Sequence, residues 1–216
     1  MNNKIIFSTI CWMSLLCNVA LAQEKTPILI ENFDKNTNGW AETSFKEGDF
    51  AIRDGFYEFE HKRFRGAWTN VIAVEIPMDK NYEIIASITT IKSLKTCNFG
   101  LVWGKNDDGD QYEFTINRDG EYSIEKQENY ERVPMAYQTW IVSSAIKEGD
   151  GAVNELKIVR TGFELAFYIN DSKVHVLRHK KFYGNQIGFK VNDNQKIAID
   201  FLKINSIEPK KMTDDK

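Results

Sequence analysis

The chain has 216 residues and carries 28 basic against 31 acidic side chains, which gives a formal net charge of −3. This slight acidity is spread along the sequence and argues against nucleic acid or an anionic membrane as a partner. No segment after the first 22 residues approaches the roughly 20 consecutive apolar residues that a membrane-spanning helix needs.

Residues 1–22 have the pattern of a secretory signal peptide. Lys4 gives a short basic start, an apolar run extends over residues 5–19, and Ala20-Leu21-Ala22 is a small-residue cleavage site. Cys17 raises the alternative of an acylated bacterial lipoprotein, but it follows a leucine where the lipoprotein pattern has a small residue. We therefore expect cleavage after Ala22 and export to the periplasm, the cell surface or the medium.

Cleavage leaves 216 − 22 = 194 residues, a length that fits one large β-sandwich domain. Cys97 is the single cysteine of this remainder, so we expect a buried thiol and no intramolecular disulfide. We assign one domain to residues 23–207. The tail at 208–216, EPKKMTDDK, has lost apolar periodicity and is expected to fray.

Short segments with alternating apolar and polar residues follow in chain order and predict β-strands throughout. No segment has the pattern of a long amphipathic helix. The expected strands lie near residues 28–33, 40–45, 50–53, 56–64, 68–76, 82–91, 99–103, 111–117, 121–126 and 140–146, with five more in 152–204.

Two Asp-Gly pairs predict tight hairpins. Asp54-Gly55 and Asp119-Gly120 each lie between two alternating runs, and glycine accepts the positive φ that such turns need. Before the second turn, Tyr112, Phe114 and Ile116 alternate with polar residues. One face of this hairpin is therefore expected in the core and the other in water. The whole pattern predicts an all-β fold, a two-sheet antiparallel sandwich.

Four segments carry a resemblance to a known superfamily. They are IENFDKNTNGW (30–40), FGLVWG (99–104), FELAFYINDSKV (163–174), which has Asp171 where glycine is usual, and the closing stretch 186–204 with IGF and IDFLKI. Together they resemble the laminin-G-like domains of the concanavalin A-like lectin/glucanase superfamily. The resemblance implies a jelly roll of two curved sheets, as found in lectins, carbohydrate-binding modules, glycoside hydrolases and protein-interaction modules.

The sequence contains no clear catalytic motif. Glycosidases need two carboxylates, and hydrolases of this superfamily place theirs on one strand as E-x-D-x-x-E, which is absent here. Glu58 with Glu60 and Glu121 with Glu125 are the nearest pairs, and solvated strand residues explain them more simply. The segments FGLVWG and 186–204 also resemble hydrolases of keto-sugar glycosides, but no catalytic residue can be transferred from them. We assign no catalytic residue.

Metal and cofactor sites are also not indicated. His61, His175 and His179 lie outside any nucleophile or metal motif, and we expect them at the surface. The loop 105–111, KNDDGDQ, offers the oxygen donors that calcium uses, yet acidic loops are common without a metal because Asp, Asn and Gly suit turns. We expect no cofactor, with calcium at this loop as the alternative.

Aromatic residues suggest glycan binding, because sugar rings stack on flat aromatic side chains while polar neighbours bind the hydroxyls. Most tryptophans of a sandwich belong to its core, and two are candidates for exposure because of their polar or glycine neighbours. An ordinary solvated sheet face with ion pairs is an equal alternative. The expected binding patch comprises Arg63, Arg65, Trp68, Trp103, Gln111 and Glu113.

We therefore expect an exported, non-catalytic module that binds a carbohydrate or polysaccharide on its concave sheet. A glycoside hydrolase of the same fold, including the keto-glycoside type, is the first alternative. A protein-interaction or structural envelope module is the second.

Overall fold

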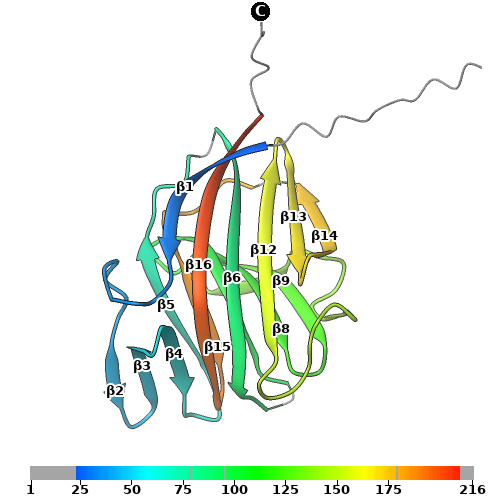
Figure 1. Ribbon diagram of the computed structural model, residues 1–216. Helices are drawn as coiled ribbons and strands as arrows, with labels where there is room; N and C mark the ends of the chain where they lie inside the picture. The colour runs from blue at the N-terminus through cyan, green and yellow to red at the C-terminus, as the bar shows by residue number, and fades with distance from the viewer. Residues whose placement is uncertain (1–22, 78, 95, 179, 210–216) are drawn as a thin grey trace, which may run out of the picture.

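The computed structural model describes residues 23–209 except 78, 95 and 179, and forms 16 strands from them (Figure 1). None of these residues is helical, so the described part contains no helix that could cross a membrane. The strands are β1 (Gln23–Glu31), β2 (Thr43–Phe45), β3 (Gly48–Arg53), β4 (Phe56–His61), β5 (Ala67–Ala73), β6 (Asn81–Lys92), β7 (Asn98–Lys105), β8 (Gln111–Asn117), β9 (Glu121–Glu128), β10 (Glu131–Pro134), β11 (Ile141–Val142), β12 (Val153–Thr161), β13 (Glu164–Ile169), β14 (Ser172–Arg178), β15 (Gln186–Asn192) and β16 (Gln195–Pro209).

Two antiparallel sheets form a sandwich. The nine-stranded sheet has the order β14-β13-β12-β6-β16-β4-β3-β2, with β1 paired to β16, and lies toward the viewer in Figure 1. The seven-stranded sheet has the order β10-β9-β8-β7-β15-β5, with β11 paired to β9, and lies behind it. The expected all-β, two-sheet antiparallel sandwich is therefore confirmed.

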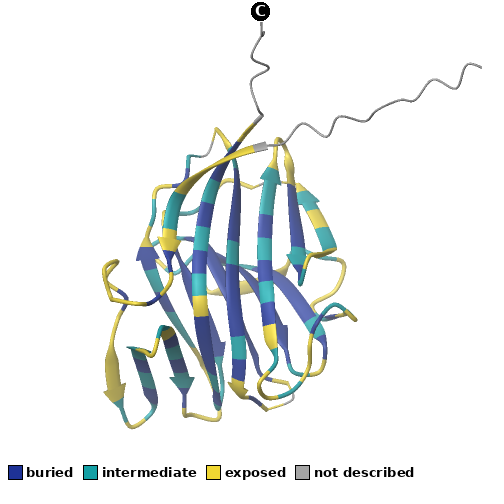
Figure 2. Ribbon diagram, viewed as in Figure 1, coloured by how far each residue is buried: buried dark blue, intermediate teal, exposed yellow. Residues whose placement is uncertain are grey.

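Buried and less buried residues alternate along strands such as β4 and β12 of the nine-stranded sheet, because one side of the sheet faces the partner sheet (Figure 2). The strands β7, β8 and β15 of the seven-stranded sheet are instead buried almost throughout, so the expectation that one face of β8 lies in water is wrong. Aromatic rings join the two sheets at the centre of the core. The Trp40 ring lies 5.3 Å from that of Tyr57 on the nine-stranded sheet and 5.6 Å from that of Phe189 on the seven-stranded sheet. Such ring pairs contribute roughly 0.5–1.5 kcal/mol beyond the area that they bury.

A buried carboxylate fixes the segment that follows β1. Glu31 accepts hydrogen bonds from the Phe33 backbone N–H (2.9 Å), the Asn38 side-chain amide (2.7 Å) and the Trp40 indole N–H (3.0 Å). These donors satisfy an ionisable group that is buried at the end of β1, which would otherwise be costly. The opening segment thereby holds Trp40 in the core.

The predicted hairpins form with the expected backbone. Asp54 and Gly55 have φ of 52° and 79° between β3 and β4, and Gly120 has φ of 77° between β8 and β9. Asn170 and Asp171 connect β13 to β14 with φ of 47° and 65°, so two non-glycine residues adopt the conformation for which glycine is usual. Asparagine and aspartate tolerate this left-handed region better than other side chains.

The five strands expected in 152–204 are β12 to β16. Four expected strands are shorter than predicted: 40–45 contributes only β2, 140–146 contributes only β11, and the strands expected at 56–64 and 68–76 end at His61 and Ala73. β10 was missed, because all four of its residues are exposed and show no alternation. β16 continues through Pro209, with Glu208 paired to Glu24, whereas residues 1–22, expected to be a signal peptide, and residues 210–216 lie outside the described residues.

Candidate functional site on the seven-stranded sheet

Alternate residues of the seven-stranded sheet point away from the nine-stranded sheet and form an outer face. On β8, Tyr112 and Phe114 belong to the core, so Gln111 and Glu113 turn outward. On β15 both neighbours of Lys190 are core residues, so Lys190 also lies on the outer face. The polar residues of this outer face include Asn98, Gln111, Glu113, Thr115, Asn117, Ser123, Glu125, Lys190 and Asn192.

A buried ion pair between Glu113 and Lys190 lies at the centre of the outer face. Their side chains are 1% and 0% exposed, and the Lys190 ammonium donates to Oε2 of Glu113. The Gln111 side-chain amide donates to Oε1 of Glu113 at 2.6 Å, and the Arg132 guanidinium lies 3.5 Å from the same oxygen. One carboxylate thus organises three donors from β8, β10 and β15.

A glycine makes room for this pair. β7 lies between β8 and β15, and its Gly100 is in register with Lys190 on one side and Thr115 on the other. A Cβ atom at Gly100 would lie 2.3 Å from the carbonyl oxygen of Phe114, so no side chain fits there without backbone movement. Lys190 can therefore reach across β7 to Glu113.

Burial and the neighbouring carboxylates shift the pKa of Lys190 in opposite directions. Burial lowers its pKa below the ordinary value, and the Glu113 and Glu125 carboxylates partly offset this effect. The ammonium is thus held by carboxylates rather than by water. Such a group interacts strongly with any polar ligand that reaches it, because the surrounding dielectric is low.

Three polar atoms of the outer face have no hydrogen-bond partner among the described residues. They are Oγ of Ser123, Oδ1 of Asn98 and Oδ1 of Asn192. Ser123 is fully buried, and Asn98 is nearly so, with its amide 3.4 Å from Oγ1 of Thr115. Buried polar atoms normally find partners, so these atoms mark places where a water or a ligand hydroxyl is needed.

Two carboxylates of the outer face are direct cross-strand neighbours. Glu113 of β8 is in register with Glu125 of β9, and both side chains point outward. Cβ atoms of opposed residues in antiparallel strands lie about 4.5–5.5 Å apart. The carboxyl groups of this pair therefore come from adjacent strands, not from one strand as in the E-x-D-x-x-E pattern.

No family model and no curated protein matches this sequence. Solved structures do match. The carbohydrate binding module CBM66 from Bacillus subtilis has 16% identity and a TM-score of 0.57, over 76% of this chain and 93% of that one. A Bacillus subtilis protein of unknown function with a galectin-like fold has 10% identity and a TM-score of 0.61, over 88% and 100%. The catalytic domain of an endo-1,3-beta-glucanase (laminarinase) from Thermotoga petrophila has 9% identity and a TM-score of 0.58, over 85% and 98%.

The chain has the concanavalin A-like jelly-roll fold. This agrees with the resemblance that the four sequence segments carried. The structural overlap establishes the fold, whereas identities of 9% to 16% leave the function to be argued from this chain's own residues.

The jelly roll brings Gln111 and Glu113 together, as expected from the sequence, but separates them from both arginines. Arg63 and Arg65 are exposed on the loop between β4 and β5, which leads into the edge strand β5. Three strand spacings separate β5 from β8, a distance of about 14 Å. Lys190 takes the place that was expected for the arginines.

The tryptophan part of the expected patch is wrong, because both indoles lie on the inner side. Trp103 is 1% exposed, and its ring stacks on that of Tyr112 at 5.6 Å. Trp68 packs against the core, with its ring 4.7 Å from that of Phe45 and 5.4 Å from that of Phe50. Trp103 is a core residue and Trp68 is a partly buried residue packed against the core, so neither lies on the outer face.

The histidines also differ from expectation. His61 is buried, with its Nδ1 3.2 Å from the Arg63 backbone N–H, and its ring lies 5.5 Å from that of Trp68. His175 is half-buried beside Tyr122. His179 lies outside the described residues.

The loop considered for calcium uses several of its oxygens internally. Oδ1 of Asn106 accepts from the Asp110 backbone N–H (2.8 Å), and Oδ1 of Asp110 accepts from the Asn129 backbone N–H (2.8 Å). Oδ1 of Asp107 accepts from the Gln186 amide at 2.6 Å. The described residues contain no group of three or more His, Cys, Asp or Glu placed to hold a metal ion.

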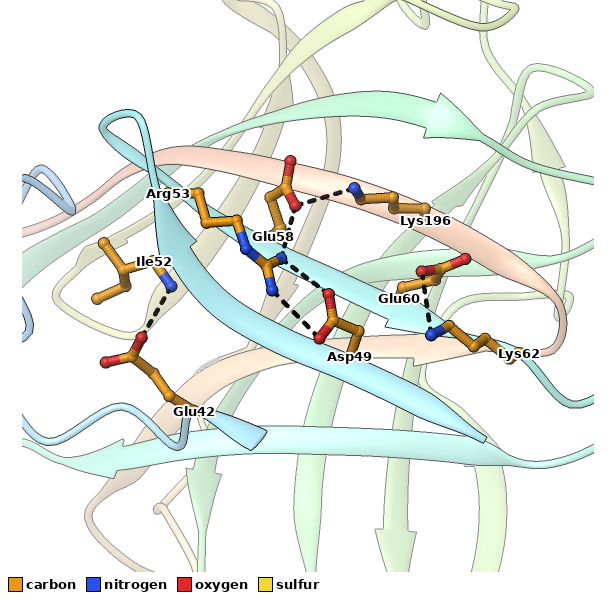
Figure 3. A network of polar contacts seen from close by, with 8 residues as sticks. All are labelled: Glu42, Asp49, Ile52, Arg53, Glu58, Glu60, Lys62 and Lys196. Atoms are coloured by element: carbon orange, nitrogen blue, oxygen red, sulfur yellow. Dashed lines mark hydrogen bonds and ion pairs between the residues drawn. The ribbon is translucent and has the colours of Figure 1, made fainter. Parts of the chain in front are cut away.

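The Glu58 and Glu60 carboxylates belong to an ion-pair network on the nine-stranded sheet (Figure 3). Arg53 bridges Glu58 and Asp49, Lys196 lies 2.9 Å from Glu58, and Glu60 has its own lysine partner. Burial raises the pKa of Glu58, but hydrogen bonds from Lys196 and Arg53 outweigh it and keep this pKa below its usual value. Glu58 therefore stays ionised and is unsuited to act as a general acid.

Proposed function

We propose that this protein is an exported, non-catalytic module that binds a neutral carbohydrate on the outer face of the seven-stranded sheet. The observation that carries the proposal is the combination of the Glu113 and Lys190 pair with the unpartnered oxygens of Ser123 and Asn98. The carbohydrate-binding module and the laminarinase of similar fold support it as analogies. Export rests on the leader pattern of residues 1–22.

Sugar hydroxyls suit this surface because each hydroxyl can donate one hydrogen bond and accept two. The Arg132 guanidinium, which is partly exposed beside Glu113, supplies donors, and the buried Glu113 and Lys190 pair lies behind it. The oxygens of Ser123 and Asn98 have no partner among the described residues, and a water or a hydroxyl group held at this face would supply one.

A glycan array probed with the mature protein, with and without calcium, tests the proposal. The ligand that binds is then titrated against Ser123→Ala and Glu113→Gln. Ser123→Ala removes an unpartnered buried hydroxyl, so we expect unchanged or higher stability together with at least threefold weaker binding. Glu60→Gln is the matched control, because it changes a carboxylate on the outer side of the other sheet.

Absence of binding to any glycan would reject this function in favour of a protein-interaction or structural envelope module. Binding that Ser123→Ala and Glu113→Gln leave unchanged would reject the outer face as the site, even if a glycan binds.

A glycoside hydrolase is the second candidate, and the cross-strand neighbours Glu113 and Glu125 favour it. Glycosidases use two carboxyl groups that flank the scissile bond. Hydrolysis of array-positive oligosaccharides, followed by chromatography, would show this activity. If the pair is catalytic, Glu113→Gln and Glu125→Gln should each lower kcat at least 100-fold, and turnover that survives both substitutions would exclude it.

A further inference from the structure

A pocket of about 440 Å³ opens at an edge of the sandwich, where β14 of the nine-stranded sheet faces the ends of β8 to β10. We call it the edge pocket. Its apolar wall comes from Tyr112, Met135, Leu177 and Tyr183. These residues turn toward the inside of the sandwich, so the seven-stranded sheet separates the edge pocket from the outer face around Glu113. Its volume lies within the range of small-molecule sites, about 300–1,000 Å³.

Three aromatic rings form a continuous stack that ends in the edge pocket. Trp103 stacks on Tyr112 with a centroid distance of 5.6 Å, and Tyr112 stacks on Tyr183 at 4.9 Å with an interplanar angle of 26°. Trp103 and Tyr112 are buried, whereas Tyr183 is partly exposed. The stack therefore offers an aromatic surface in the pocket that is supported rigidly from behind.

Cations dominate the rim of the edge pocket. Its charged residues are four basic side chains and one carboxylate, Glu128, which forms an ion pair with Lys126. No ion pair involves Arg178, Lys180 or Lys181 among the residues that the structure describes. Three basic side chains without an ion-pair partner among the described residues thus gather around an apolar pocket in a chain whose net charge is −3.

The loop that carries two of these lysines is anchored to the seven-stranded sheet. The backbone N–H groups of Tyr183 and Gly184 both donate to the carbonyl oxygen of Gly104 at 3.0 Å. The Tyr112 hydroxyl donates to the carbonyl oxygen of Lys181, also at 3.0 Å. The backbone of the segment that carries Lys181 is therefore held in place before any ligand arrives, which lowers the entropic cost of binding.

We infer that the edge pocket binds an acidic sugar, a uronate unit, in addition to the neutral carbohydrate proposed for the outer face. The sugar ring would lie against Tyr183 and the apolar wall, since aromatic rings stack on the C–H faces of sugars. Its carboxylate would lie among Arg178, Lys180 and Lys181, where charge-assisted hydrogen bonds are available. The outer face differs in both respects. The tryptophans of the seven-stranded sheet, Trp68 and Trp103, point to its other side, and Lys190 is already paired with Glu113.

Calorimetric titration with tetragalacturonate tests this inference, with a neutral tetrasaccharide and decanoate as comparison ligands. We expect the uronate to bind at least tenfold more tightly than either, and more weakly as salt rises from 50 to 300 mM. The double variant Lys180→Gln/Lys181→Gln should weaken uronate binding at least tenfold. Tyr183→Leu should weaken it, whereas Tyr183→Phe should preserve it.

Two control variants distinguish binding in the edge pocket from general attraction to positive charge and from binding on the outer face. Lys147→Gln, which removes an exposed positive charge elsewhere, should leave uronate binding unchanged, and so should Glu113→Gln on the outer face. Equal affinity for uronate and neutral sugar, tighter binding of decanoate, or an equal loss in Lys147→Gln would each overturn the inference. Because the neutral-glycan measurements depend on Glu113 and these do not, either proposal can fail alone.

Discussion

Removing one partner of the Glu113 and Lys190 pair should destabilise the protein far more than removing both. The two side chains are 1% and 0% exposed, so Glu113→Leu leaves an ammonium, and Lys190→Met a carboxylate, without its main partner. Breaking a buried pair in this way costs about 3–5 kcal/mol of unfolding free energy, whereas an apolar replacement of both is often neutral or stabilising. Some of the cost is relieved by Gln111 and Arg132, so we expect about 3 kcal/mol for each single variant.

Urea unfolding at pH 7, followed by tryptophan fluorescence, measures these changes at constant m-value. The double variant Glu113→Leu/Lys190→Met should lie within about 1 kcal/mol of the wild type, which, with about 3 kcal/mol for each single variant, gives a coupling energy of about 5 kcal/mol. Single variants that each cost less than about 0.5 kcal/mol and add in the double variant would show that water solvates the pair. The claim of a shielded site would then be wrong.

The pH dependence of the free energy of unfolding of the Glu113→Leu variant is an independent test of the buried pair. Burial lowers the pKa of Lys190 in the folded state, so the unfolded chain binds more protons between that pKa and 10.5. Stability from this group therefore rises with pH across that window. The deficit of Glu113→Leu relative to the wild type should be smaller at pH 9.5 than at pH 7.

Three further predictions concern other buried residues. Burial lowers the pKa of His61 in the folded state. Below pH 6.5 the imidazole therefore binds a proton in the unfolded chain more readily than in the folded protein, so the free energy of unfolding should fall as the pH drops. His61→Asn should reduce the loss between pH 7.5 and 5.5 by up to about 1.4 kcal/mol in urea unfolding, and an unchanged loss would exclude His61 as its source. Trp103→Ala should cost about 3–5 kcal/mol because it empties a core position, and a cost below about 1 kcal/mol would place the indole at the surface. Gly100→Ala should lower the free energy of unfolding, measured with urea, by at least about 1 kcal/mol, because its Cβ would meet the Phe114 carbonyl. An unchanged free energy of unfolding would refute the close approach of β7 and β8.

Local sequence signals predicted the fold well because hairpins and alternation are local properties. Asp54-Gly55 takes the positive φ values expected of it, and the core-facing residues of β8 are those that alternation selects. β10 carried no such signal, because an exposed edge strand that ends in Pro134 has no apolar side to show.

The candidate site was harder to predict because it depends on pairing between distant strands. Glu113 and Lys190 are 77 residues apart and meet only because β7 separates their strands with Gly100 at the crossing point. A lysine between the apolar neighbours of β15 was the available signal, and it marks an outward position on a buried strand. Trp103 could not be oriented, because FGLVWG is apolar on both sides of the strand.

Chemical-shift mapping with the glycan found on the array tests the central claim most directly. We predict that amide and side-chain signals of Asn98, Thr115 and Ser123 shift together as the neutral glycan is added, with little change in the network around Glu58. Shifts confined to another surface, or none at saturating glycan, would contradict a binding site on the outer face of the seven-stranded sheet.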